Sequence, residues 1–148
     1  TINNAGIKTE ELASVNANWN PELAQSAIES LLLKYDGNIE AIIANSDSMA
    51  IGAVNALQKY GYNMGNKAKI IPVFGINALP EAQELIKNGF MAGSVFQNTR
   101  EFADALYAVG MNLVSGNYPL EGTNYKFDKT GAIILMPFQE YTVENLET

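Results

Sequence analysis

Four side chains that could contact a ligand follow four successive apolar runs of the chain, at the point where each run ends. They are Trp19, Ser46, Asn77 and Gln97. A side-chain amide offers donors and an acceptor in one plane, which matches adjacent hydroxyl groups of a sugar. The face of an indole packs against the apolar face of a pyranose ring. The set therefore predicts a binding site for a neutral polyol, without a titrating group.

The same residue types also have structural uses. Asparagine and serine are common in turns and at helix caps, and a tryptophan such as Trp19 can be a half-buried packing residue. On this alternative interpretation the four side chains only end strands and begin helices. The pattern by itself leaves both interpretations open.

Several classes of chemistry are excluded by residues that the chain lacks. None of its 148 residues is histidine or cysteine, which excludes thiol catalysis, disulfides, Ser-His-Asp triads and histidine zinc sites. No glycine-rich phosphate loop follows an apolar run, and the carboxylates show no spacing typical of glycosidases. We therefore expect a binding protein and not an enzyme, with no cofactor.

The composition is that of a globular domain with a sizeable core, with 47% hydrophobic and 17% charged residues. A net charge of -7 and a pI near 4.5 argue against nucleic acid and against an anionic membrane surface as partners. No apolar run approaches the roughly 20 residues of a membrane span.

The elements that must position the four side chains alternate along the chain. Apolar runs predict strands over residues 11–15, 39–44, 69–75, 92–96 and 131–136. Apolar stripes predict helices from Pro21 to Asp36-Gly37, from Ser46 or Asp47 through Leu57, from Pro80 to Asn88-Gly89, and from Asn98 or Thr99 to Ser115-Gly116. Strands that alternate with helices predict an α/β fold, with a parallel sheet flanked by helices. Ligands bind beyond the carboxyl ends of such strands, where the turn of residues 45–47 lies.

The remaining segments are less regular. Residues 1–7 predict the end of a helix closed by Gly6, residues 60–66 an exposed loop, and residues 141–146 a terminal helical turn. Residues 117–130 form the longest irregular stretch and are a candidate hinge.

Three stretches together resemble a known family. They are residues 39–57, the segment PVFGINALPEAQELIKNGFMAGSVFQ over residues 72–97, and GTNYKFD over residues 122–128. With Ala17-Asn18-Trp19-Asn20 they are similar, in register, to periplasmic galactose/glucose-binding proteins of ABC sugar transport. The resemblance implies a type I periplasmic-binding-protein fold, in which two α/β lobes close on a monosaccharide at a hinge. It also implies a role as a ligand carrier in chemotaxis.

The resemblance assigns a role to each of the four side chains. Trp19 takes the place of the indole that stacks on one face of the sugar. Ser46 and Gln97 stand where the family has asparagines, and Asn77 stands where it has an aspartate, the key acceptor. One of the four positions is therefore kept, and three are changed to other polar types.

The resemblance also implies a calcium ligand. Glu40 matches a glutamate that binds Ca²⁺ in the family, although the loop that supplies the other ligands would lie before Thr1. Asp36, Asn38 and Glu40 alternate along the chain but fall short of a calcium-binding set on their own. We therefore expect calcium only in a longer parent protein.

On the family pattern, residues 1–97 belong to a C-terminal lobe. Residues 98–136 hold a helix and a strand of the N-terminal lobe after a hinge, and residues 137–148 are a returning tail. The chain would thus hold incomplete parts of both lobes. The expected partners are a monosaccharide, an ABC transporter permease or a membrane sensor or chemoreceptor, and the remainder of the parent chain or a second copy, but no nucleic acid. The expected location is periplasmic or extracellular, with a membrane anchor in a missing N-terminus left open.

Other functions remain open at this point. The same fold forms the effector-binding core of sugar-responsive transcription repressors, which an upstream helix-turn-helix would reveal. A degenerate binding module with an altered ligand is a further alternative, because three site positions are changed. A flavodoxin-like enzyme is a third, and a nucleotide bound at the turn beginning with Asn45 would reveal it.

We predict that the purified chain pairs with a second copy, or with the rest of its parent, as in a domain swap. The stripe Phe102, Leu106, Val109 and Leu113 and the apolar run 131–136 need cover, because exposing both would leave a larger apolar patch than monomers tolerate. Light scattering should therefore give a mass of at least two copies. A monomer that unfolds cooperatively at high dilution, with no other chain bound, would contradict this expectation.

Overall fold

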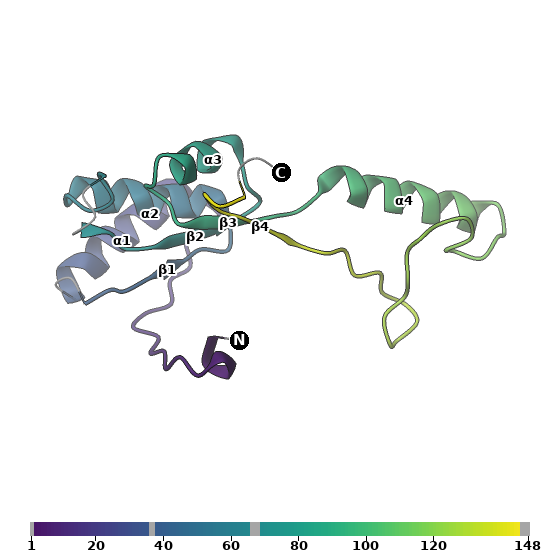
Figure 1. Ribbon diagram of the computed structural model, residues 1–148, viewed down its shortest axis with the longest axis horizontal. Coiled ribbons are helices and arrows are strands. Elements are labelled where there is room, and N and C mark those ends of the chain that lie inside the picture. Colours follow the sequence, from purple (N-terminus) through teal and green to yellow (C-terminus); the bar gives the residue numbers. More distant parts are fainter. Residues whose placement is uncertain (1, 36–37, 66–68, 146–148) are drawn as a thin grey trace. The chain divides into compact units, whose positions relative to one another are not determined.

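The computed structural model describes residues 2–35, 38–65 and 69–145 (Figure 1). The predicted helix stop at Asp36-Gly37, the end of the loop at Asn66 and the end of the last turn at Leu146 lie outside these residues. The chain divides into two compact units, one of Thr1–Val95 with Glu140–Thr148 and one of Phe96–Gln139. The assignment of residues 1–97, 98–136 and 137–148 to the lobes of a larger protein stays a prediction.

The first unit is built on a sheet with the strand order β1-β2-β3-β4. The strands are β1 (Ile42–Ile43), β2 (Val73–Ile76), β3 (Gly93–Phe96) and β4 (Gln139–Tyr141). The pairs β1–β2 and β2–β3 are parallel, with Ile42 opposite Val73 and Phe74 opposite Gly93. The predicted α/β fold with a parallel sheet is therefore confirmed.

Its helices begin and end close to where the sequence places them. A 3-10 helix η1 (Ile2–Ala5) precedes Gly6, whose φ of 81° suits the predicted helix end. The α-helices are α1 (Pro21–Tyr35), α2 (Asp47–Lys59) and α3 (Pro80–Lys87). Asn20 caps α1, since its Oδ1 accepts a hydrogen bond from the backbone N of Leu23 at 2.7 Å. The residue that caps α2 is Ser46 and not Asp47, since Ser46 Oγ accepts from the backbone N of Met49 at 3.3 Å.

Helix α2 is the centre of the core. Its predicted stripe Ala50, Ala53, Val54 and Leu57 is at most 2% exposed, and the helix contacts α1, α3, β1 and β2 (Figure 1). Each fully buried valine or leucine side chain stabilises the fold by about 1.5–3 kcal/mol. The core therefore depends on α2 lying close to all of its neighbours.

An ion pair at the surface joins α1 to α2. Lys59 Nζ lies 2.8 Å from Glu29 Oε2, and this hydrogen bond lowers the pKa of Glu29 below its ordinary value. An exposed pair of this kind adds little to stability.

Two predicted strands are absent from the part of the chain that the structure describes, and the predicted last turn is shorter than expected. Residues 11–15 form no strand in the structure, because Leu12 and Val15 are exposed and no neighbouring strand pairs with them among the described residues. Residues 131–136 contribute only an isolated antiparallel bridge between Phe127 and Ile134. Of the last helical turn predicted over residues 141–146, Tyr141 instead belongs to β4 and packs against the core, while residues 142–145 form a turn in which the backbone N of Asn145 donates to the carbonyl of Thr142 at 3.2 Å.

The strand predicted over residues 39–44 is also shorter than expected. Pairing is limited to Ile42–Ile43, and the side chain of Ile43 is exposed, as is that of its partner Phe74 on β2. The two lie on the face of the sheet opposite to α2, since Val73 and Gly75 alternate with Phe74 and are buried. Strands β1 and β2 therefore pack against the core on one face only.

The second unit contains α4 (Thr99–Val114). Of the two predicted caps, Asn98 and not Thr99 caps this helix, because the Oδ1 of Asn98 accepts from the backbone N of Glu101 at 3.1 Å. The C-cap is Ser115, where the sequence placed the helix end. The segment after the helix returns along it, held by Asn112 Nδ2, which donates to the carbonyl oxygens of Pro119 and Glu121 at 3.0 and 2.8 Å. Apolar side chains that remain exposed include Phe102, Leu106, Tyr107, Met111, Leu113 and Val114.

A tight turn over residues 128–131 follows in the same unit. Asp128 Oδ1 accepts hydrogen bonds from the hydroxyl and the backbone N of Thr130, at 2.6 and 3.0 Å. The hydroxyl of Thr130 thereby lowers the pKa of Asp128 below its ordinary value.

No helix among the described residues is both long and apolar enough to cross a bilayer.

The close approach of α2 to α1 generates a stability prediction. A Cβ at Gly52 would lie 2.1 Å from the carbonyl oxygen of Pro21, and backbone atoms cannot give way cheaply. Gly52→Ala should therefore lower the free energy of unfolding by about 2 kcal/mol or more.

Gly110→Ala is the matched control, because Gly110 lies inside α4 with no atom within 4 Å of an added Cβ. This control should be neutral or stabilising by up to about 1 kcal/mol. Urea unfolding followed by circular dichroism measures both variants, and equal losses in the two would contradict the packing argument.

Candidate ligand-binding site

Trp19 lies in the loop before α1 and points into solvent, with 68% of its surface exposed. It and its neighbour Asn18 have positive φ angles of 60° and 49°, in a region that residues with a side chain rarely adopt. The turn is held by hydrogen bonds from the backbone N of Asn18 to Asn16 Oδ1 and from that of Asn20 to the carbonyl of Ala17, both 2.9 Å. Trp19 is therefore not the half-buried packing residue of the alternative interpretation.

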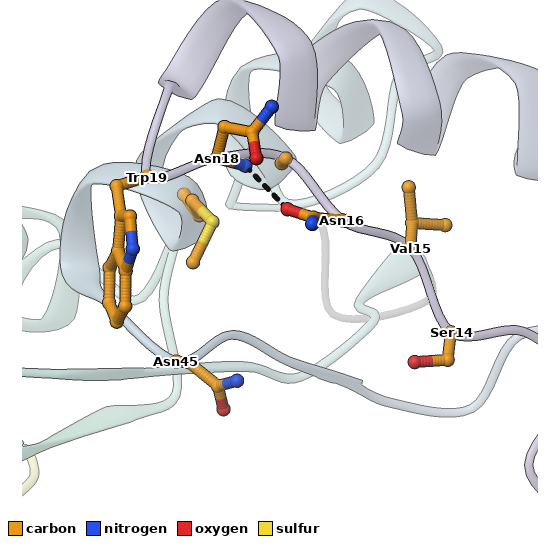
Figure 2. A pocket seen from close by; sticks show the side chains of 8 residues that line it. Ser14, Val15, Asn16, Asn18, Trp19 and Asn45 are labelled. Atoms are coloured by element: carbon orange, nitrogen blue, oxygen red, sulfur yellow. Dashed lines mark hydrogen bonds between the residues drawn. The ribbon is translucent and has the colours of Figure 1, made fainter.

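A hollow of about 280 Å³ lies beside this loop. Figure 2 shows Trp19 and Asn45 at one end of it and Ser14 and Val15 at the other. The lining residues are Ser14, Val15, Asn16, Ala17, Asn18, Trp19, Asn45 and Met49. The lining thus combines an indole with three amides and a hydroxyl, and none of its side chains is charged.

The turn after β1 contributes Asn45 to this lining, whereas the predicted site residue Ser46 is not one of the lining residues. Ser46 is only 6% exposed, and its hydroxyl is the cap of α2. Asn45 comes directly before it, is exposed and borders the hollow. The role of Ser46 toward a sugar therefore stays a prediction.

The other two predicted site residues are exposed, and neither is a lining residue of the hollow. Asn77 directly follows β2 in the first unit, with a φ of 112°. Gln97 directly follows β3 and belongs to the second unit. The roles of Trp19, Asn77 and Gln97 toward a sugar stay predictions.

Among the described residues, five residues other than glycine have a positive φ. Four of these five lie in the loops that contain Trp19 and Asn77. They are Asn18, Trp19, Asn77 and Ala78. Such backbone strain persists only where the surrounding structure holds it, and it is often found at binding sites. The strain therefore adds an independent reason to place a site at these two loops.

Asp47 is a buried polar residue that the sequence analysis considered only as a helix cap. Its side chain is 0% exposed. Its Oδ2 accepts from the backbone N of Leu79 at 2.6 Å, and its Oδ1 accepts from the hydroxyl of Ser94 at 2.6 Å. The carboxylate thus connects the start of α2 to the loop after β2 and to β3. The available signal was an acidic residue at the end of the polar turn 45–47, but the partners of Asp47 are distant in sequence.

Calcium binding through Glu40 finds no support in the described residues. Glu40 is exposed, and no group of three carboxylate, histidine or cysteine side chains surrounds a common point in the part of the chain that the structure describes. Calcium takes about six to eight oxygen ligands. These residues alone therefore do not fit the ion, and a calcium site in a longer parent stays a prediction.

The fold is α/β, and the hollow beside Trp19 is lined by an indole and by uncharged polar side chains. The sequence model of the periplasmic binding protein domain matches residues 2–117. The chain belongs to this family, as its resemblance to sugar-binding periplasmic proteins of ABC transporters predicted.

Relatives of known name are similar over nearly the whole chain. The D-galactose/methyl-galactoside binding periplasmic protein of Haemophilus influenzae is 33% identical over 146 residues, which are 98% of this chain and 41% of that protein. An ABC transporter periplasmic solute binding protein from Actinobacillus succinogenes with bound D-allose has a TM-score of 0.74 at 23% identity. It is matched over 93% of this chain and 43% of its own.

A second solved structure of a solute-binding protein has a similar fold. An ABC transporter solute binding protein from Bacillus halodurans with bound myo-inositol has a TM-score of 0.71 at 26% identity, over 93% of this chain and 42% of that one. The predicted type I periplasmic-binding-protein fold is therefore confirmed. The chain spans less than half the length of each of these three proteins.

Proposed function

We propose that this chain is part of an extracytoplasmic solute-binding protein of a sugar ABC transporter, which holds a monosaccharide or related polyol between two lobes without reacting with it. The observation that carries the proposal is the exposed indole of Trp19 beside a hollow whose polar side chains are all uncharged. The bound or named ligands of the three similar proteins are D-galactose or methyl-galactoside, D-allose and myo-inositol. All of them are neutral polyols, which is the ligand class that such a lining suits.

The lining suggests how a sugar would bind. The apolar face of a pyranose would pack on the indole of Trp19, and its hydroxyl groups would exchange hydrogen bonds with the amides of Asn16, Asn18 and Asn45. Because the backbone of residues 18–19 is already held in its bent form, little ordering would remain to be done on binding. Without a titrating lining residue, affinity should vary little around neutral pH.

The partners and location follow from the same proposal. A solute-binding protein of this class delivers its ligand to a membrane permease, and one that senses sugars contacts a membrane sensor or chemoreceptor. The relatives are periplasmic, which supports a location outside the cytoplasm.

Sugar binding can be measured through Trp19, because it is the only tryptophan of the chain. Titration with D-galactose, D-glucose, D-allose and myo-inositol should shift its emission to the blue and saturate for at least one of them, since stacking removes water from the indole. The absence of a saturable response to every probe would overturn the proposal.

Calorimetry should test the same binding without relying on the fluorophore. Trp19→Leu should abolish binding or weaken it at least about tenfold, because stacking of a base on an aromatic ring contributes roughly 1–3 kcal/mol and we expect a loss of the same order for a sugar ring. Tyr107→Leu is the matched control, since Tyr107 is an equally exposed aromatic residue of α4, at 72%, and should leave affinity unchanged.

The amide of Asn77 generates a further prediction about sugar preference. It stands where the resembling family has an aspartate, and an ionised acceptor makes hydrogen bonds about twice as strong as a neutral one. We expect weak or no binding of glucose and galactose. Asn77→Asp should strengthen it roughly tenfold, by ~1–2 kcal/mol.

Calorimetry on the chain, and on the complete protein of which we propose it is part, measures this change. Asn55→Asp is the control for the added charge, since Asn55 is an exposed residue of α2. Sub-micromolar affinity of the unaltered protein for either sugar would contradict the expected weakness.

A further inference from the structure

Three consecutive backbone N–H groups in the loop after β2 each donate to an acceptor on β3 or α2. The N–H of Asn77 donates to the carbonyl of Val95 at 2.8 Å. That of Ala78 donates to Ser94 Oγ at 3.1 Å, and that of Leu79 donates to Asp47 Oδ2 at 2.6 Å. The backbone of this loop is therefore held along its whole length.

The hydroxyl of Ser94 connects two of these hydrogen bonds. It accepts from the N–H of Ala78 and donates its own proton to Asp47 Oδ1 at 2.6 Å. Ser94 is 5% exposed and Asp47 is 0% exposed, so neither side chain is available to a ligand. Any effect of Asp47 and Ser94 on ligand binding must therefore act through the loop after β2.

The conformation that the pair holds is one that the loop would not adopt by itself. Asn77 and Ala78 have φ angles of 112° and 50°, which are sparsely populated for residues with a side chain. No side chain caps α3 at its N-cap residue Leu79. The buried carboxylate of Asp47 instead accepts the hydrogen bond of the Leu79 N–H.

The carbonyl side of the loop is held as well. Gln83 Nε2 donates to the carbonyl oxygen of Ala78 at 2.7 Å, and the hydroxyl of Tyr141 donates to Gln83 Oε1 at 3.2 Å. The space for the carboxylate is equally specific, because a Cβ at Gly75 would lie 2.2 Å from Asp47 Oδ1. The strained loop is thus fixed from both sides.

We propose that Asp47 and Ser94 are positioning residues for the ligand, which hold the backbone so that the exposed amide of Asn77 stays in one orientation for a polyol hydroxyl. This role rests on the proposed function. Asp47 follows the turn of Asn45 and Ser46 directly, so the same carboxylate also ties the loop of Asn77 to a wall of the hollow. The two loops are expected to hold their relative positions together.

A double-mutant cycle on ligand affinity tests the role. The variants Ser94→Ala, Asn77→Ala and the double variant are titrated with D-allose and with myo-inositol, using the emission of Trp19. Ser94→Ala should weaken binding about tenfold in the unaltered background, as expected for the loss of one ordering hydrogen bond. It should have no further effect once Asn77 is alanine, because its influence passes through that side chain.

Two further variants separate positioning from general stability. Ser94→Thr keeps the hydroxyl and should retain affinity. Ser30→Ala, at an exposed serine of α1, should change nothing. Independent losses in the cycle, with each variant folded by circular dichroism, would overturn the role while leaving the proposed function in place. If the Trp19 emission of the unaltered chain does not respond to either polyol, both the positioning role and the proposed function would be overturned.

Amide hydrogen exchange on the unaltered protein tests whether the loop is held, without a ligand and without any variant. The N–H groups of Ala78 and Leu79 should exchange far more slowly than those of Tyr60 and Gly61, whose N–H groups also donate hydrogen bonds but to carbonyls of an exposed helix end. Fast exchange at Ala78 and Leu79 would overturn the claim that Asp47 and Ser94 hold the loop.

Discussion

A carboxylate with no cationic partner is costly to bury unless its oxygens are hydrogen-bonded. Asp47 is fully buried at the start of α2, and in the described part of the chain it forms no ion pair. Its two oxygens instead accept from Leu79 and Ser94. These bonds keep the ends of β1 and β2 and the body of β3 in a common arrangement, on which the edge of the sheet that carries the candidate site depends.

Close packing around α2 makes this arrangement possible. Two glycines provide the space: Gly52 lets the helix touch the backbone of Pro21, and Gly75 leaves room for the carboxylate of Asp47. Another polar anchor lies at the opposite end of β2. Asn63 is 1% exposed and its amide bonds to the backbone of Ile71 and Phe90. The first unit is thus held by buried hydrogen bonds at both ends of its central strand.

In the second unit, local sequence signals correctly predict the ends of a helix but not the presence of a strand. Helix α4 begins at its asparagine cap and ends at Ser115, because both signals act through neighbouring residues. The run 131–136 has an equally clear apolar pattern but forms no strand, because a strand needs hydrogen-bonding partners that this unit does not supply. The exposed apolar side chains of α4, such as Leu106 and Val114, fit a segment whose packing partner lies elsewhere.

The sequence by itself determined the four α-helices, the parallel strands β1, β2 and β3, the starts of α2 and α4 to within one residue, and the turns in which Trp19 and Asn77 lie. These features depend on periodicity and on interactions between residues close in the chain. Only the tertiary structure decided that Ser46 faces inward while Asn45 borders the hollow, and that Asp47 reaches Leu79 and Ser94, which are 32 and 47 residues away. Such contacts depend on where the packed strands place side chains that are distant in sequence, and local sequence patterns do not predict these positions.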